Sequence, residues 1–155
     1  MIKTDEFSKD LCRTLTELLP ALEWRCGWSR EGRERVDLVG VPKRKNGRYV
    51  LIEVELRRLS PVSNIVKIWR WIKKRQFHSR PLIFQAFSGF YSRHDSHRLN
   101  AEFIGRRMEQ AGLVRYRSIS IPYRPRKGGK VGAGRRRYHA VNLAKTVSKT
   151  LAAKQ

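Results

Sequence analysis

Acidic residues and cysteine are both scarce in this sequence. Its 155 residues include 13 Asp and Glu against 35 Lys and Arg, which gives a formal net charge of +22 at pH 7. The two cysteines, Cys12 and Cys26, lack the spacing of a disulfide framework, so we expect small buried side chains in a reducing cytoplasm. No apolar run approaches the ~20 residues that a membrane-spanning helix needs, and the polar first residues do not resemble a signal peptide. These absences predict a soluble cytoplasmic protein without a membrane partner.

The positive charge is carried by a chain with enough apolar residues to fold. Hydrophobic residues make up 40% of the sequence, and its length is typical of a single domain with a real core. We therefore interpret the charge as a surface for a polyanion and not as a sign of disorder. Nucleic acid is the expected partner, because phosphate neutralisation supplies most non-specific affinity. DNA is favoured over RNA as that partner. An anionic membrane is the weaker alternative.

Two predicted strands with a short turn between them are the most informative stretch. They are expected at 35–41 and 48–56, joined by a turn that Pro42, Asn46 and Gly47 indicate. Side chains alternate along a strand, so one face of the second strand carries Tyr49, Leu51, Glu53 and Glu55. Its other face carries Val50, Ile52, Val54 and Leu56. A strand with so many apolar residues is expected inside a sheet. An ionised carboxylate buried there needs a cation or strong hydrogen-bond donors beside it.

Three carboxylates form the candidate metal site. Asp37 lies in the apolar run of the first strand, and Glu53 and Glu55 project from one face of the second. Three acids on neighbouring strands of so basic a chain favour a divalent cation, and oxygen ligands suit Mg²⁺ or Mn²⁺ rather than zinc. The alternative is an exposed edge strand whose two glutamates pair with Arg57, Arg58 or other cations. The strand pattern leaves both interpretations open.

This arrangement resembles the core of the PD-(D/E)XK nuclease superfamily, which has the restriction-endonuclease-like fold. The resemblance spans about residues 4–121 and is carried by Asp37, by the sequence IEVE with Glu53 and Glu55, and by the helix that follows. It implies that Asp37 and Glu53 hold the metal ion. The sequence departs from the family pattern at Val36, which replaces the usual Pro, and at Glu55, which replaces the usual Lys.

The departure at Glu55 changes the roles that the resemblance implies. Some members of the superfamily carry Glu at this position, and others place the Lys on the following helix, where Lys67 is the candidate here. Glu55 is then a second metal ligand or the base that orients the attacking water, and Lys67 offsets charge on the phosphate. The first helix of this fold often adds an acid to the site. Glu6 or Asp10 is that candidate, with helix capping and solvated acids as the alternative.

The remaining pattern predicts an α/β fold. Helices are expected at 5–19, 61–75 and 96–111, with Ser60 and Ser96 as the N-caps of the last two. Further strands are expected at 23–29, 81–88 and 114–121. The crossover from Glu53 through the second helix implies parallel pairing, hence a mixed central sheet of about five strands flanked by helices in the order αβββαβ. The apolar faces of the second and third helices are expected to be Val62, Ile65, Trp69 and Ile72, and Leu99, Phe103, Ile104, Met108 and Ala111.

The composition changes after residue 121. Residues 1–121 are expected to form the nuclease-like domain, and 122–155 a flexible basic arm with a weak final helix that docks or forms a partner surface. His139 follows three arginines and is expected on the surface, with a phosphate contact as the alternative. The residues expected to contact nucleic acid are all basic: Lys43, Arg44, Lys45, Arg57, Arg58, Arg70, Lys73, Lys74, Arg126, Lys127, Lys130, Arg135, Arg136 and Arg137.

The leading hypothesis is a Mg²⁺-dependent endonuclease that hydrolyses phosphodiester bonds in DNA. The resemblance also suggests a homodimer, because two strands of a duplex need two active centres. A non-catalytic nucleic-acid-binding protein that uses only its basic surface and arm is the alternative. An RNA-binding structural protein of the ribosomal kind fits the charge but leaves the three strand acids unexplained.

Overall fold

The computed structural model describes residues 4–57, 60–124 and 132–153. Along these ranges the chain forms α1 (Thr4–Leu18), β1 (Leu22–Glu31), β2 (Glu34–Pro42), β3 (Val50–Glu55), α2 (Pro61–Lys73), β4 (Leu82–Phe87), α3 (Ser96–Gln110), β5 (Arg115–Ser120) and α4 (Ala133–Ala152). None of the helices in these ranges is long and apolar enough to cross a membrane.

The strands of the described ranges form one five-stranded mixed sheet in the order β1-β2-β3-β4-β5. Strands β1 and β2 pair antiparallel through a short turn, and β2 and β3 pair antiparallel through the loop 43–49. Strands β3, β4 and β5 pair parallel through the crossover helices α2 and α3. The parallel pairing sets Glu53 opposite Gln85 and Glu55 opposite Phe87. This topology confirms the predicted α/β fold with a mixed sheet flanked by helices.

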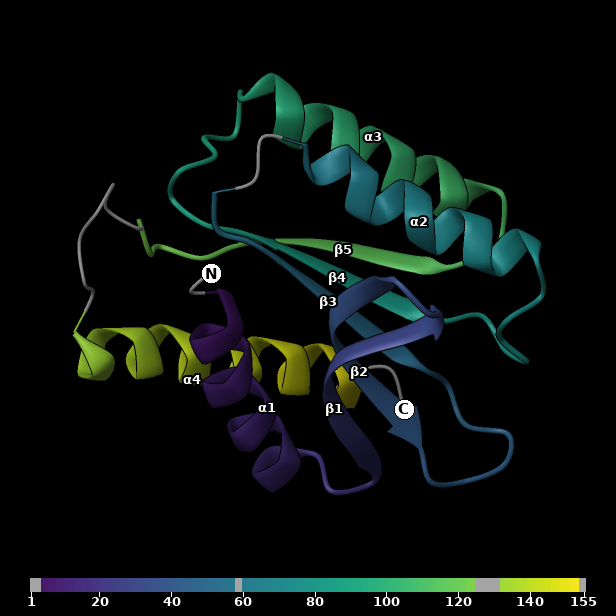
Figure 1. Ribbon diagram of the computed structural model, residues 1–155, viewed down its shortest axis with the longest axis horizontal. Coiled ribbons are helices and arrows are strands. Elements are labelled where there is room, and N and C mark those ends of the chain that lie inside the picture. The colour runs from purple at the N-terminus through teal and green to yellow at the C-terminus, as the bar shows by residue number, and fades with distance from the viewer. Residues whose placement is uncertain (1–3, 58–59, 125–131, 154–155) are drawn as a thin grey trace.

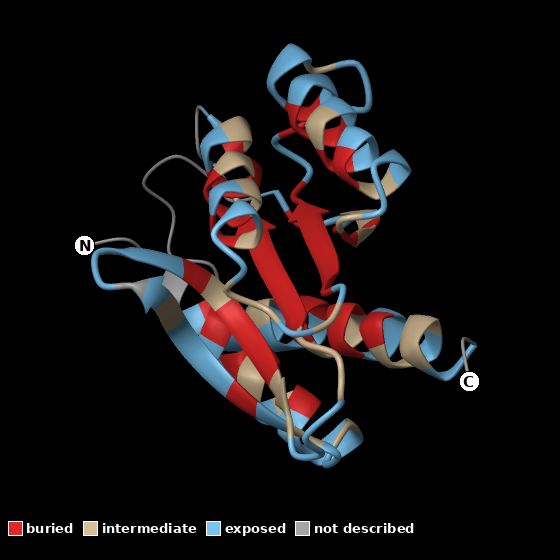
Figure 2. Ribbon diagram, turned by 90° about the vertical axis from the view of Figure 1, so that its right-hand side faces the viewer, coloured by how far each residue is buried: buried red, intermediate tan, exposed pale blue. Residues whose placement is uncertain are grey.

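Helices cover both faces of the sheet, with α2 and α3 on one side and α1 and α4 on the other (Figure 1). Strands β3 and β4 run between these two layers and are buried along their whole length (Figure 2). The alternation in β3 decides which residues face which layer. Ile52 and Val54 pack with α1 and α4, whereas Leu51 packs with α2 and α3. Glu53 and Glu55 alternate in step with Leu51 and therefore face the layer that contains α2.

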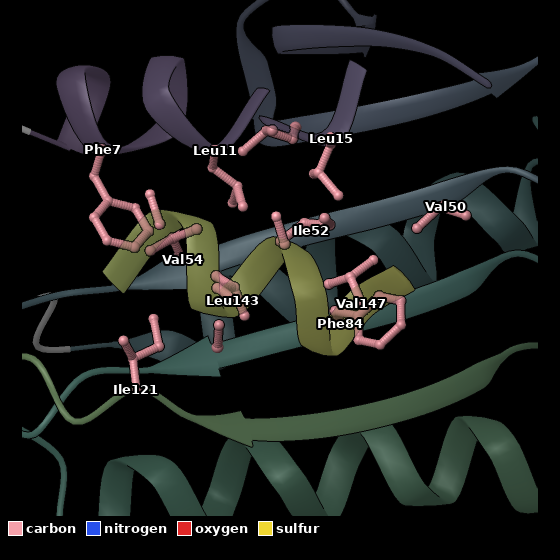
Figure 3. Packing of buried hydrophobic residues seen from close by; sticks show 14 of the residues in the cluster. Phe7, Leu11, Leu15, Val50, Ile52, Val54, Phe84, Ile121, Leu143 and Val147 are labelled. Carbon is pink, nitrogen blue, oxygen red and sulfur yellow. The ribbon is translucent and has the colours of Figure 1, made fainter. Parts of the chain in front are cut away.

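The core under α1 is built by residues at helical spacing. Phe7, Leu11 and Leu15 are one turn apart on α1 and point at Ile52 and Val54 of β3 (Figure 3). Their exposed fractions are at most 1%. Burial of a large apolar side chain contributes about 1.5–3 kcal/mol, so this layer fixes the position of β3.

Helix α4 belongs to the same core. Leu143 and Val147 are buried in one cluster with Phe7 and Leu11 of α1 (Figure 3). Its buried face also carries His139, of which 6% is exposed, so the surface position expected for this residue is wrong. The sequence analysis gave 122–155 as a basic arm whose weak final helix docks or forms a partner surface, and in the structure this helix packs on the sheet. Residues 125–131 of this stretch lie outside the described residues.

Helix α3 begins and packs differently from the sequence prediction. Its N-cap is Asp95 rather than Ser96, because the Asp95 side chain accepts hydrogen bonds from the backbone N–H groups of the following turn. Leu99 and Phe103 are 47% and 63% exposed. The buried face carries the small residues Ala101 and Gly105 together with Arg98, Glu102 and Met108. A Cβ on Gly105 would lie 2.4 Å from the Tyr116 ring. Met108 of the predicted apolar face is fully buried and Ile104 packs against the core, whereas close helix-to-strand packing at Gly105 turns Leu99 and Phe103 outwards.

Helix α2 turns a partly polar face to the sheet. Ile65, Ile68 and Trp71 are buried, and so are the polar residues Asn64 and Lys67. Of the predicted apolar face, Ile65 is fully buried, and Val62, Trp69 and Ile72 are half-buried and pack against the same cluster. A buried amide and ammonium need partners in the sheet. Helix α2 therefore delivers polar groups to β3.

The two cysteines are not the buried apolar residues that we expected. Cys12 on α1 is half-buried, and Cys26 on β1 is exposed. Cys26 Sγ lies 3.5 Å from the carbonyl oxygen of Ser8, one turn before Cys12. A hydrogen bond with Cys26 lowers the pKa of the Cys12 thiol to about 7, although burial raises it.

Candidate functional site

The candidate site lies where β2 leaves β3. The two strands pair only at Leu38–Ile52, Val39–Leu51 and Gly40–Val50, and the same register would set Asp37 opposite Glu53. At this fork Asp37 Oδ2 accepts a hydrogen bond from the backbone N–H of Val54 at 2.7 Å. A carboxylate therefore replaces the backbone acceptor that a continuing strand would offer. The fork brings Asp37 to the end of β3 that carries the glutamates.

Glu53 is a buried carboxyl between an acid and a cation. It is 1% exposed, and its Oε1 lies 2.6 Å from Lys67 Nζ. Burial raises the pKa of Glu53 well above its usual value, Asp37 raises it further, and Lys67 opposes both. Oε2 of Glu53 is also buried and takes no hydrogen bond from any described residue. A buried acceptor of this kind is suited to a cation.

Lys67 reaches the fork from the second turn of α2. Its Nζ donates to the carbonyl oxygen of Arg35 at 2.5 Å and to Asn64 Oδ1 at 3.1 Å, and it lies 2.6 Å from Glu53 Oε1. An ammonium has three N–H donors, so these acceptors satisfy it although the side chain is buried. The structure thus brings Asp37, Glu53 and Lys67 together, which the sequence analysis predicted.

Glu55 points to different partners. Its carboxyl is fully buried, and Oε1 accepts hydrogen bonds from Asn64 Nδ2 at 2.8 Å and from Gln85 Nε2 at 2.9 Å. Of the charges that act on the pKa of Glu53, that of Glu55 has the smallest effect. The predicted group of three converging acids is therefore a pair, Asp37 and Glu53, with Glu55 bound to amides beside it.

The accessory acids proposed on α1 lie on the other side of the sheet. Asp10 Oδ2 is 2.7 Å from Arg136 Nε, and Glu6 Oε2 is 2.6 Å from Arg136 Nη1. Arg136 comes from α4, so these ion pairs join two helices of the α1 layer. The structure therefore does not bring Glu6 or Asp10 to Glu53. It also makes Arg136 a half-buried structural residue, which corrects its assignment to the nucleic-acid surface.

The remaining basic candidates are spread over the molecule. The turn with Lys43, Arg44 and Lys45 is exposed, but it lies at the other end of the hairpin from Asp37 and Glu53. Lys43 follows Asp37 by six residues, or ~20 Å of extended chain. Arg70 is exposed and forms an ion pair with Glu34. Arg57, Lys73, Lys74, Arg135 and Arg137 are exposed, and Arg58, Arg126, Lys127 and Lys130 fall outside the described residues.

Sequence reasoning gave Asn64 and Gln85 no role in the site. Gln85 is one amide within the apolar strand β4, and Asn64 lies three residues before Lys67 on the same face of α2. Both are buried, and a buried amide requires hydrogen-bond partners. A polar residue inside an apolar run is the signal that could have identified them.

The pair of acids fits a hard divalent cation with few protein ligands. Within the described ranges, no three His, Cys, Asp or Glu side chains stand close enough to hold an ion. The backbone carbonyl of Val54 offers a third ligand. The Glu55 carbonyl accepts a hydrogen bond from Ser88 N–H on the β4 side of the strand. Backbone groups alternate in direction along a strand, so the N–H and carbonyl of Val54 point towards β2 and Asp37. Mg²⁺ is typically held by one or two carboxylates with several waters. Asp37, Glu53 and the Val54 carbonyl meet that requirement.

Comparison with known protein families finds no model that matches this chain, and comparison with curated proteins finds no similar sequence.

Proposed function

We propose that this protein is a Mg²⁺-dependent nuclease that hydrolyses phosphodiester bonds in DNA. The observation that carries the proposal is the buried Glu53 carboxyl. It lies beside Asp37, forms an ion pair with Lys67 Nζ at 2.6 Å, and takes no hydrogen bond of ordinary geometry from the described residues at either oxygen. Two acids and a lysine at a fork in a mixed sheet agree with the resemblance to the PD-(D/E)XK superfamily. The net charge of +22 supplies attraction for a polyanion.

Each side chain of the site has a stated task in this proposal. Asp37, Glu53 and the Val54 carbonyl would hold Mg²⁺ or Mn²⁺. The bound ion supplies Lewis-acid polarisation of a phosphoryl oxygen and lowers the pKa of a coordinated water. Lys67 forms an ion pair with Glu53 in the absence of a cation. When Glu53 takes a cation instead, the Lys67 ammonium can donate to a phosphate oxygen and offset its negative charge.

The alternative is a nucleic-acid-binding protein without catalysis. Its support is that Lys67 already neutralises Glu53, and that the described part of the chain offers no group of three acids. A buried ion pair of this kind can also be purely structural. Both functions predict salt-sensitive binding, so binding alone does not separate them.

Cleavage of labelled DNA in Mg²⁺ and in EDTA separates the two functions. Duplex, branched and single-stranded substrates should be offered, with RNA as a fourth. We expect cleavage by the wild type in Mg²⁺ only, and a loss of at least about 100-fold for Asp37→Asn and Glu53→Gln. Glu23→Gln is the matched control, because Glu23 is exposed and pairs with Arg25 away from the site. If the wild type binds these substrates but cuts none of them in Mg²⁺ or Mn²⁺, the nuclease is excluded and the non-catalytic nucleic-acid-binding protein remains.

A further inference from the structure

We propose that Glu55 is a positioning residue, which acts through Asn64 on Lys67, and not a metal ligand. The inference rests on the proposed nuclease function, in which Lys67 meets the phosphate. It is carried by an unbroken chain of hydrogen bonds that joins Lys67 to Asn64 and Asn64 to Glu55.

The chemistry of the chain fixes its direction. Lys67 can only donate, so the Asn64 atom that faces it at 3.1 Å must be the amide oxygen. The amide nitrogen of Asn64 then faces the other way, where Glu55 Oε1 accepts its hydrogen bond at 2.8 Å. Loss of the acceptor at residue 55 would let the Asn64 amide turn, and Lys67 would lose one of its three acceptors.

A second amide holds Glu55 from the opposite side. Gln85 Nε2 donates to Glu55 Oε1 at 2.9 Å and to the Pro61 carbonyl at 3.1 Å, so its oxygen must point away from both. That oxygen accepts from the Tyr116 hydroxyl at 2.8 Å. Burial raises the pKa of Tyr116, which keeps the phenol protonated and able to donate. Glu55 is thereby tied to α2, β4 and β5 at once.

Such a chain suits a lysine that must be held in one place. Lysine carries its charge on a flexible four-carbon stem, so its ammonium is fixed only by the acceptors around it. Of the three acceptors of Lys67, Arg35 contributes backbone and Glu53 is the proposed metal ligand. Asn64 is therefore the side chain that keeps Lys67 in place when Glu53 binds a cation. A misplacement of 1 Å can cost about 100-fold in rate.

Two variants of Glu55 distinguish positioning from ligation. Glu55→Gln keeps an oxygen that accepts from both amides but is a poor ligand, whereas Glu55→Ala removes the acceptor. We expect Glu55→Gln to cleave DNA within about threefold of the wild type, and Glu55→Ala and Asn64→Ala to lose roughly 10- to 100-fold. Mn²⁺ affinity, measured by calorimetry, should stay the same in all three and should fall in Glu53→Gln.

Glu102→Ala is the matched control for the loss of a buried carboxyl. Glu102 accepts hydrogen bonds from Arg98 and Ser118 on α3 and β5, outside the chain that ends at Lys67. Its replacement should lower stability and leave the rate per folded molecule unchanged. The double variant Glu55→Ala/Asn64→Ala should lose no more than either single variant, because both interrupt one chain.

The ¹⁵Nζ NMR signal of Lys67 reports the surroundings of its ammonium and requires no cleavage activity. We expect it to shift in Glu55→Ala and in Asn64→Ala and to stay in place in Glu55→Gln and Glu102→Ala. A wild type that does not cut DNA would end the proposed function, and the Lys67 signal would still decide the positioning. The proposal is overturned if Glu55→Gln weakens Mn²⁺ binding as much as Glu53→Gln does. It is also overturned if the losses of cleavage rate in the double variant are additive, or if the Lys67 ¹⁵Nζ signal does not shift in Glu55→Ala.

Discussion

Lys67 and Glu53 place two opposite charges in the protein interior, 2.6 Å apart. The cost of burying such a pair is offset only while both charges are present. Sequence alternation correctly set Glu53 and Glu55 on one face of β3, and the resemblance named Lys67 of the following helix as a further member of the site. The partners of each carboxyl could not be predicted, because a strand pattern fixes the face and leaves the side-chain direction open. Glu53 meets a cation, and Glu55 meets two amides.

Lys67→Met should destabilise the metal-free protein by about 3–5 kcal/mol at pH 8, because it leaves Glu53 buried without a cation. The loss should be smaller at pH 5. A carboxyl whose pKa is raised in the folded state adds stability below its unfolded pKa, and that stability is lost as pH rises through the folded pKa. Urea unfolding in EDTA measures this. Lys73→Met, which removes an exposed charge, should change stability by less than about 0.5 kcal/mol. An equally small effect of Lys67→Met at both pH values would contradict the buried pair.

Cys12 should react with iodoacetamide at neutral pH. Its pKa of about 7 means that half of the thiol is ionised there, and the thiolate is the nucleophile. Mass spectrometry of the Cys12 peptide across pH 6 to 10 should show a midpoint near 7 in the wild type. Cys26→Ala removes the hydrogen bond that lowers the pKa of Cys12, and it should move the midpoint towards the ordinary thiol value of about 8.5. A wild-type midpoint that Cys26→Ala leaves unchanged would rule out the contact between the thiols.

The helices show what periodicity predicts and where it stops. Helix α1 was predicted within one residue at each end, because Phe7, Leu11 and Leu15 repeat cleanly and Pro20 follows. The faces of α2 and α3 were predicted only in part, since each also buries polar or small residues that an apolar template does not count. Gly105 is the clearest case, because the missing Cβ lets the helix approach Tyr116.

Leu143→Ala tests whether α4 is part of the core. Leu143 is 3% exposed between α1 and the sheet, so its truncation should cost about 2–5 kcal/mol of unfolding free energy. Lys145→Ala on the exposed side of the same helix is the control and should change stability by less than about 0.5 kcal/mol. Denaturant unfolding followed by circular dichroism gives both values. If α4 were an independent arm, the two variants would be alike.

For the whole molecule, composition predicted a folded basic protein, and the order of elements predicted the mixed sheet. Two short-range signals carried that topology: a turn between β2 and β3, and a crossover helix between β3 and β4. The docking of α4 on the sheet could not be decided from the sequence, because weak apolar spacing after a Gly-rich basic stretch is also typical of a flexible arm. Glu6, Asp10 and Arg136 hold that docking through pairs more than 120 residues apart in sequence.

Nucleic-acid binding should depend steeply on salt. If the basic surface neutralises 6–10 phosphates, affinity should fall by about 10³–10⁵ between 50 and 200 mM salt. Replacement of Lys43, Arg44 and Lys45 by Ala should reduce the slope by up to about one per residue, whereas Glu53→Gln should keep the wild-type slope. Fluorescence anisotropy with labelled DNA measures both. Affinity that is independent of salt would exclude a surface that acts through its charge.

Anomalous diffraction from crystals soaked in Mn²⁺ tests the central claim most directly. The account predicts a peak coordinated by the carboxylates of Asp37 and Glu53, with Lys67 displaced from Glu53, and no peak in Glu53→Gln. A wild-type crystal without a peak, in which Lys67 still lies on Glu53, would contradict it.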